Sequence, residues 1–123
     1  MSNETSLPAQ SAPLDHLREL SEQEIEWMLQ IGYLYIQLEK WDTAKILIET
    51  LLVFDPGNID GLVNLAYVHM ETANFDMALK ICEKLLKTSL TFRGREYDRS
   101  TIEKLRRLTL QKMTDQKRNR DQK

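Results

Sequence analysis

The sequence resembles itself when it is shifted by 34 residues, and this internal repeat limits the fold more than any other feature. The matched pairs include small, aromatic and acidic residues: Gly32 with Ala66, Tyr33 with Tyr67, Trp41 with Phe75, Asp42 with Asp76, and Ala44 with Ala78. Each copy therefore specifies the same structural unit, and the first copy is centred on residues 27–56.

Small residues recur at two fixed places in each copy. Gly32 and Ala66 stand in the first half of the unit, and Ala44 and Ala78 stand in the second half. A glycine within a helix costs roughly 1 kcal/mol relative to alanine, so its presence indicates a close contact between helices. This spacing predicts two antiparallel helices per unit, with Trp41 and Phe75 filling the turns.

A 34-residue period with these small residues is the signature of the tetratricopeptide repeat (TPR). The structural signature here comprises Gly32, Ala44, Pro56, Ala66 and Ala78. We predict an all-α fold, a TPR-like helical repeat array. It has two complete helix-turn-helix repeats at residues 25–58 and 59–92 and a partial third, which makes five to six helices in all.

The domain is expected to cover residues 14–113. Residues 1–13 are rich in Ser, Asn, Pro and Gln, which predicts a disordered N-terminal segment. Leu14 to Leu20 is expected to form a short lead-in helix over the open end of the first repeat. The expected main helices cover residues 22–39, 42–54, 59–72 and 76–89, and Asp42 is the expected cap of the second. Residues 91–94 interrupt the pattern. A capping helix at 97–113 is expected to cover the helix at 76–89 with Ile102, Leu105 and Leu108, and a basic flexible tail follows at 114–123. Ser21 and Glu24 form a capping box, and Asn58 caps the third of these helices.

The charge is unevenly distributed along the chain. Residues 1–92 carry 6 Lys and Arg against 14 Asp and Glu, whereas residues 93–123 carry 11 against 5. The acidic body argues against a nucleic-acid partner, and the basic helix suits an acidic protein surface better. One cysteine, Cys82, fits a reducing compartment. Without a signal peptide or an apolar run of about 18 residues, we expect a soluble cytoplasmic protein with no membrane insertion.

In a TPR array the first helix of each pair lines the concave face. Periodicity places the following residues on that face as a predicted partner-binding groove: Leu29, Tyr33, Ile36, Gln37, Val63, Asn64, Tyr67 and Met70. Such a surface suits an apolar helix or an extended peptide, with the tyrosines providing large contact areas. The alternative is that some of these residues contact the lead-in helix or the capping helix folded back into the groove.

No catalytic, metal-binding or cofactor-binding residues are predicted. His16 and His69 are far apart, and both His69 and Cys82 stand at positions that the repeat assigns to the core. HExxH, CxxC, a phosphate-binding glycine loop and a nucleophile elbow are all missing from the sequence. Leu29 and Tyr33 occupy places where TPR co-chaperones hold a terminal carboxylate with Lys and Asn, so a carboxylate clamp is not expected.

The segment from Trp27 to Asn58, WMLQIGYLYIQLEKWDTAKILIETLLVFDPGN, resembles the opening repeat of small TPR chaperones of bacterial type III secretion. The resemblance covers residues 20–90 and is closest to chaperones that pair with an early secreted component at the export gate. It implies a cytoplasmic bacterial chaperone that holds a small, helical, poorly soluble secretion protein in its groove and presents it to the export apparatus. The alternative is a generic TPR adaptor or scaffold in another pathway. Whether the unliganded protein forms a homodimer stays open.

Overall fold

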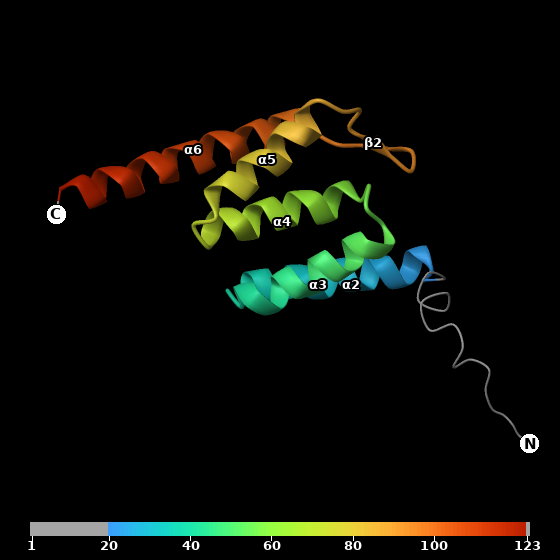
Figure 1. Cartoon of the computed structure of the whole chain (residues 1–123). Coiled ribbons are helices and arrows are strands. Elements are labelled where there is room, and N and C mark those ends of the chain that lie inside the picture. Colours follow the sequence, from blue (N-terminus) through green and yellow to red (C-terminus); the bar gives the residue numbers. More distant parts are fainter. Residues whose placement is uncertain (1–19, 123) are drawn as a thin grey trace, which may run out of the picture.

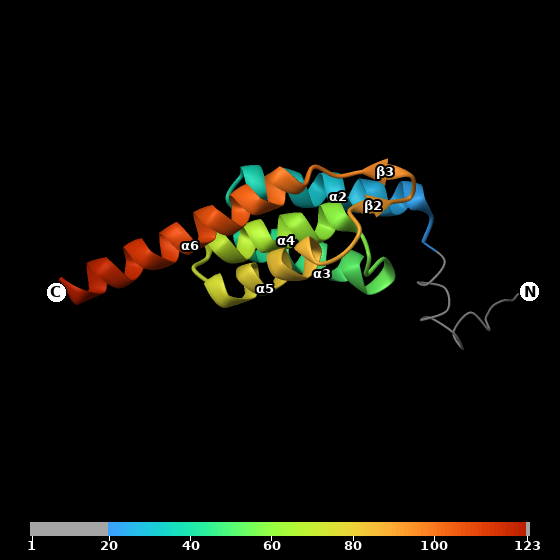
Figure 2. The same ribbon diagram turned by 90° about the horizontal axis from the view of Figure 1, so that it is seen from above.

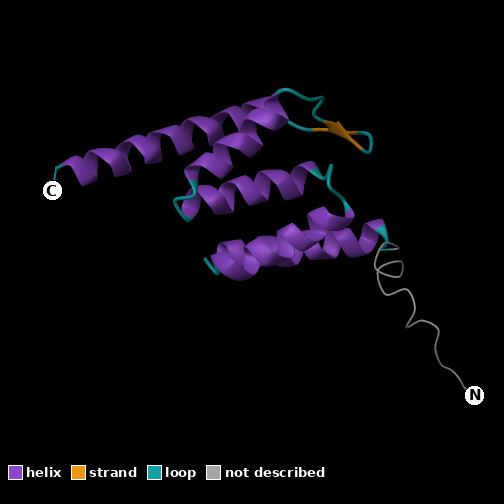
Figure 3. Ribbon diagram, viewed as in Figure 1, coloured by secondary structure: helices purple, strands orange, loops and turns teal. Residues whose placement is uncertain are grey.

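The computed structural model describes residues 20–122, which form an all-α repeat array of five helices with one short β-hairpin (Figures 1 and 3). The elements are α2 (Glu22–Gln37), α3 (Trp41–Phe54), α4 (Ile59–Glu71), α5 (Phe75–Leu86), β2 (Thr91–Phe92), β3 (Arg95–Glu96) and α6 (Arg99–Asp121). The predicted fold class is confirmed. The segment expected to be disordered, residues 1–13, and residues 14–19 of the expected lead-in helix lie outside the described residues.

The helices are stacked in chain order. α2 packs on α3, α3 on α4, α4 on α5, and α5 on α6, and α4 also contacts both α2 and α6. Figure 1 shows the resulting series from α2 and α3 at one side to α6 at the other. The C-terminal half of α6 extends beyond the other helices in both ribbon views (Figures 1 and 2).

Two predicted caps define where helices begin. Ser21 Oγ accepts a hydrogen bond from the Glu24 amide at 3.1 Å, while Glu24 Oε1 accepts from the Ser21 amide at 2.8 Å. Asn58 Oδ1 accepts from the Gly61 amide at 2.9 Å and so caps α4. These bonds satisfy amides that have no partner within the helix. The structure thus confirms the capping box and the Asn58 cap.

The two turns inside the repeats are equivalent at the level of the backbone. Glu39 and Ala73, which are 34 residues apart, both adopt positive φ, at 57° and 63°. In each turn the next amide donates back over five residues, from Lys40 to Tyr35 O at 2.9 Å and from Asn74 to His69 O at 2.7 Å. This 6→1 hydrogen bond is characteristic of a helix C-terminus that ends in a left-handed residue. The sequence repeat is therefore also a repeat of backbone conformation.

Helix bounds differ from the sequence prediction at the second helix of each pair. α3 begins at Trp41 and α5 at Phe75, so these aromatic residues are the first helical residues and not turn residues. Lys40 and Asn74 cap the two helices without a side-chain hydrogen bond. Asp42, expected as a cap, lies in the first turn of α3, where its charge favours the helix dipole.

Small residues occupy the helix crossings, as the repeat predicts. Ala44, Ala66 and Ala78 are each 0% exposed. A Cβ atom placed on Gly32 would lie 3.2 Å from Ile48 Cγ1, which is closer than ordinary packing permits. Gly61, which the repeat signature does not include, is tighter still, because its Cβ would lie 2.9 Å from Leu51 Cδ2. Helices α2 and α4 thus both approach α3 through a glycine.

The C-terminal part departs most from the prediction. Residues 91–94 were expected only to interrupt the repeat, whereas residues 91–96 form a β-hairpin in which Thr91 pairs with Glu96 and Phe92 with Arg95. Helix α6 then runs from Arg99 to Asp121, so the expected flexible tail is largely helical. Lys, Arg and Gln favour helices even without packing, and an Asp115–Arg118 ion pair at 3.7 Å spans one turn of this segment.

Gly32→Leu is expected to destabilise the fold, because the added side chain would overlap Ile48 at the α2–α3 crossing. The cost should be roughly 1–3 kcal/mol in the free energy of unfolding, which exceeds the gain in helix propensity. Urea denaturation followed by circular dichroism measures it. Gln30→Leu is the control, since it adds the same side chain at an exposed position of α2. A Gly32→Leu variant as stable as the wild type would contradict the crossing.

Two truncations should separate the packed half of α6 from its extension. Deleting residues 114–123 should leave the melting temperature almost unchanged, because residues 114–122 are exposed. Deleting residues 97–123 removes Ile102, Leu105 and Thr109, which are buried, and should lower the melting temperature strongly. Differential scanning calorimetry makes the comparison. Equal stability of the two truncated proteins would mean that α6 contributes nothing to the core.

Candidate functional site

A groove runs along α4 between α2 and α6. It has a volume of about 650 Å³ and is lined by the C-terminal half of α2, the start of α3, α4 from Val63 to Glu71 and the first half of α6. Since α4 contacts both α2 and α6, it forms the floor, and the other two helices form the walls. The groove is open to solvent and combines aromatic and aliphatic side chains with a few polar ones.

The structure brings the predicted groove residues together, with one exception. The lining includes Tyr33, Ile36, Gln37, Val63, Asn64, Tyr67 and Met70. Leu29 is the exception, because it is buried in a small cluster with Ile25 and Leu51 between α2 and α3. Leu29 lies one turn before Tyr33 but is rotated toward α3, so the predicted face was slightly too wide. Ile36 and Met70 are also mainly core residues, and they form the bottom of the groove.

The two tyrosines in register have different environments. Tyr33 is 53% exposed on the α2 wall. Tyr67 packs against the core, and its ring meets that of Trp41 edge to face, with centroids 6.2 Å apart and planes at 61°. Burial, together with the carboxylate of Glu71, raises the pKa of the Tyr67 hydroxyl, so this group stays protonated and can donate a hydrogen bond. Tyr33 is therefore free to contact a ligand, whereas Tyr67 shapes the floor.

The capping helix was considered beside the groove only as the alternative, and the residues of the α6 wall were not predicted from sequence. Thr101, Lys104, Leu105 and Leu108 line the groove from this side. Leu108 was expected to cover the core together with Ile102 and Leu105, but it is 43% exposed and faces the groove instead. α6 packs mainly on α5, the fourth of the predicted helices, which the capping helix was expected to cover. The signal was present, because the spacing of Thr101, Leu105 and Leu108 marks a second face of the helix beside Ile102 and Thr109.

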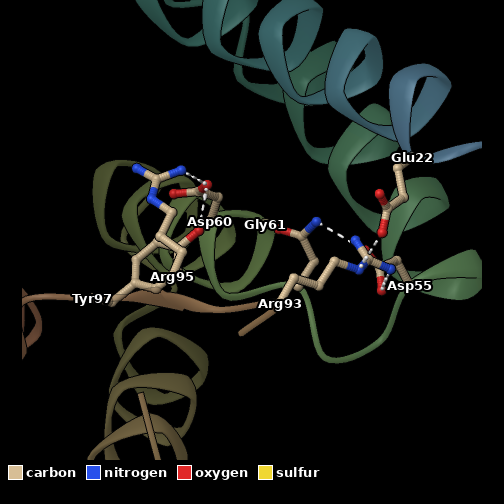
Figure 4. Close-up of polar contacts among 8 residues, drawn as sticks. Glu22, Asp55, Asp60, Gly61, Arg93, Arg95 and Tyr97 are labelled. Atoms are coloured by element: carbon tan, nitrogen blue, oxygen red, sulfur yellow. Dashed lines mark hydrogen bonds and ion pairs between the residues drawn. The ribbon is translucent and has the colours of Figure 1, made fainter. Parts of the chain in front are cut away.

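A polar clamp holds the β-hairpin, and therefore the start of α6, against the first repeat (Figure 4). Arg93 donates from Nη1 and Nη2 to both carboxylate oxygens of Asp55, at 2.9 and 3.1 Å, and its Nε lies 3.1 Å from Glu22 Oε2. Asp55 is buried and also accepts from Asn58 Nδ2 at 3.0 Å. A buried carboxylate needs such partners, since leaving it unpaired is strongly destabilising.

Tyr97 provides the second half of the clamp. Its hydroxyl donates to Asp60 Oδ2 at 2.7 Å, and Arg95 Nη1 lies 3.4 Å from the same oxygen. Burial and this hydrogen bond raise the pKa of Tyr97 to about 12, so the donor is protonated under all physiological conditions. Asp98 then caps α6 by accepting from the Ser100 amide at 3.0 Å. The clamp thus fixes the point where α6 begins.

The turn of this hairpin has a defined backbone conformation. Arg93 and Gly94 both have positive φ, at 53° and 77°. Positive φ at both central residues is the geometry of a type I′ turn, which suits a two-residue hairpin. Arg93 therefore adopts a backbone conformation that is unfavourable for a residue other than glycine. In this conformation its side chain contacts Asp55 and Glu22.

His69 is buried behind the groove floor and has an unusual hydrogen-bond state. Its Nδ1 lies 3.1 Å from Asn74 Nδ2, which can only donate, so the ring proton is on Nε2. Nε2 is buried without a hydrogen-bond partner. Burial, followed in size by the charge of nearby Lys45, lowers the pKa of His69 below its ordinary value of 6.5. These features are those of a packed neutral histidine.

Cys82 is 0% exposed in α5, and burial raises the pKa of its thiol. Since the thiolate is the reactive form, this environment makes the side chain unreactive. The described residues hold no group of three or more His, Cys, Asp and Glu side chains placed to bind a metal ion. None of the described helices is long and apolar enough to span a membrane.

Comparison of the chain with protein-family models, curated proteins and solved structures finds no match. The candidate site is therefore defined by its geometry.

The state of His69 predicts a dependence of stability on pH. Its pKa is lower in the folded protein than in the unfolded chain, so the unfolded chain binds more protons as the pH falls below about 6.5. The free energy of unfolding should then decrease toward low pH, by at most about 1.4 kcal/mol per pH unit from this group. Denaturation of wild type and His69→Gln between pH 7.5 and 5 measures the difference. Identical slopes for the two proteins would show that His69 is not the cause.

Proposed function

We propose that this protein is a non-enzymatic chaperone that binds an apolar helical segment of a partner protein in the groove. The main support for this proposal is that large apolar side chains on the two opposite walls of the groove are about half exposed to solvent. Tyr33 of α2 and Leu108 of α6 are 53% and 43% exposed, and Val63 and Trp41 lie between them. Exposed apolar surface of this kind, gathered in a concavity, is typical of a binding site.

A helix suits this groove better than a small molecule does. Helices of the protein itself form all three sides, and their parallel edges leave an open channel that an amphipathic helix can enter with its apolar face. The lining also includes charged residues. Glu39 and Glu71 stand at the α2 and α4 ends, and Lys104 stands on α6. They can contact the polar edges of the bound helix and set its direction without filling the apolar floor.

The resemblance of residues 20–90 to type III secretion chaperones extends the proposal to a biological setting. The partner is then a small helical secretion protein, kept soluble in the bacterial cytoplasm until export. The basic surface of α6, which includes Arg107 and Lys112, faces solvent and is available for an acidic surface of the export gate. A TPR adaptor in another pathway could use the same groove. A secretion chaperone and such an adaptor would then differ in the partner that they bind and not in how they bind it.

The double substitution Tyr33→Ala with Leu108→Ala should weaken binding strongly while leaving the fold intact. Both side chains are half exposed, so their loss creates no cavity in the core, whereas each should contribute about 2 kcal/mol as a contact anchor. The dissociation constant is then expected to rise by roughly a hundredfold or more. Isothermal titration calorimetry is the measurement, and the ligand is a small helical protein that co-purifies with this chain when neighbouring genes are co-expressed.

Ile46→Ala with Val53→Ala is the matched control, because these two exposed apolar residues lie on α3 outside the groove. Arg107→Glu with Lys112→Glu tests the basic helix in the same assay at low and high salt. If the control or the charge reversal abolishes binding while the Tyr33 and Leu108 variant retains it, the groove is not the binding site.

A further inference from the structure

The outer face of α2 carries a second apolar surface, which the groove does not use. Trp27, Ile31, Leu34 and Leu38 are spaced by four, three and four residues, so they share one side of the helix. This side is opposite to the one buried against α3, which consists of Ile25, Leu29, Gly32 and Ile36. The four residues, here called the outer stripe, are between 45% and 56% exposed.

The repeat shows what this face does elsewhere in the array. The residues 34 positions further on are Gly61, Leu65, Val68 and Thr72. On α4 this face receives the preceding helix, because a Cβ on Gly61 would lie 2.9 Å from Leu51 of α3. The outer stripe is thus the equivalent helix-binding face of the first repeat. No described residue buries it, although the end repeats of soluble arrays usually present polar outer faces.

The flanks of the stripe carry no charge. The spacing of the stripe is that of the a and d positions of a coiled coil, and the neighbouring positions hold Gln30, Gln37, Met28 and Tyr35. Charges at these flanking positions normally set the choice and direction of a partner helix. Neutral flanks allow the stripe to pair with a copy of itself without repulsion.

We propose that two copies of this chain associate through the outer stripe, with their α2 helices antiparallel. A two-fold axis between Ile31 and Leu34 makes the stripe self-complementary, since Trp27 of one copy then faces Leu38 of the other. A parallel arrangement would bring the acidic first turns together, whereas the antiparallel one separates them by the length of α2, about 24 Å. The dimer leaves the groove free and does not depend on the function proposed for it.

Residues 1–19 are the alternative occupant of the stripe. They offer Leu14 and Leu17, but Asp15, Arg18 and Glu19 give residues 14–19 a net charge of −1, and the first turn of α2, which follows in the chain, is itself acidic with Glu22 and Glu24. Like charges at this end disfavour such a contact. A second copy instead covers all four stripe residues at once. With the flanking side chains, the two copies would bury on the order of 1,000 Å², which is the lower bound of specific interfaces.

Sedimentation equilibrium of the full chain tests the proposal. The wild type should be a dimer at micromolar concentration, and Leu34→Glu should be a folded monomer or dissociate at least roughly tenfold more readily, because the two glutamates face apolar side chains and each other near the axis. Val53→Glu, at an exposed apolar position on α3 outside the stripe, should remain dimeric. A monomeric wild type, or a Leu34→Glu dimer of unchanged affinity, overturns the proposal. So does dimerisation that appears only when residues 1–19 are deleted, because that segment would then be the occupant.

Engineered cysteines test the direction of the helices. Cys82 is buried, so a single new thiol on α2 is the one expected to react. Leu34→Cys lies near the proposed axis and should form a disulfide-linked dimer under mild oxidation. Trp27→Cys should not, because the antiparallel geometry places the two copies of this position about 17 Å apart along the helix axis. Efficient cross-linking through Trp27→Cys with none through Leu34→Cys would overturn the antiparallel arrangement.

Discussion

Close helix crossings at small residues determine where every other element lies. Gly32 and Gly61 bring α2 and α4 against α3, and Ala44, Ala66 and Ala78 are completely buried in the core. Larger side chains there would separate the helices and change their angles. Since α4 stays in contact with both α2 and α6, the crossings also set the width and depth of the groove. The shape of the groove is therefore a consequence of the sequence repeat.

The groove nevertheless needs a second wall, and this comes from residues outside the repeat. The ion pair of Arg93 with Asp55 and the hydrogen bond of Tyr97 with Asp60 join segments that are 38 and 37 residues apart in the chain. They fasten the hairpin to the turn between the two repeats and so orient α6 along α5. The contact with Arg93 neutralises the buried carboxylate of Asp55, and it also holds the hairpin against the rest of the fold. α6 then replaces the missing third repeat on the core side and offers Leu108 to the groove.

The features that could be predicted from sequence are those that recur with the 34-residue repeat or depend on a local motif. The 34-residue repeat specified the two helix pairs, the buried alanines and most of the groove, because each of these recurs in register. The capping box at Ser21 was readable because it is local. The hairpin was not, since strands of two residues have no periodicity and Arg93 gives little sign of a left-handed turn. The contact between Arg93 and Asp55 is a tertiary interaction that local sequence does not encode. The helical state of residues 114–121 was missed because a charged stretch without an apolar face was interpreted as a tail, although its residues favour helix.

α2 is the central helix, with one side in the core, one in the groove and one exposed as an apolar stripe. If the proposed function is right, ligands enter the groove between α2, α4 and α6. The most direct measurement is nuclear magnetic resonance of the complex with a partner helix, recording intermolecular nuclear Overhauser effects. We expect contacts from the bound helix to Tyr33, Val63 and Leu108, which come from all three helices. Contacts confined to the exposed faces of α3 and α5, or to the extension of α6 beyond Met113, would contradict it.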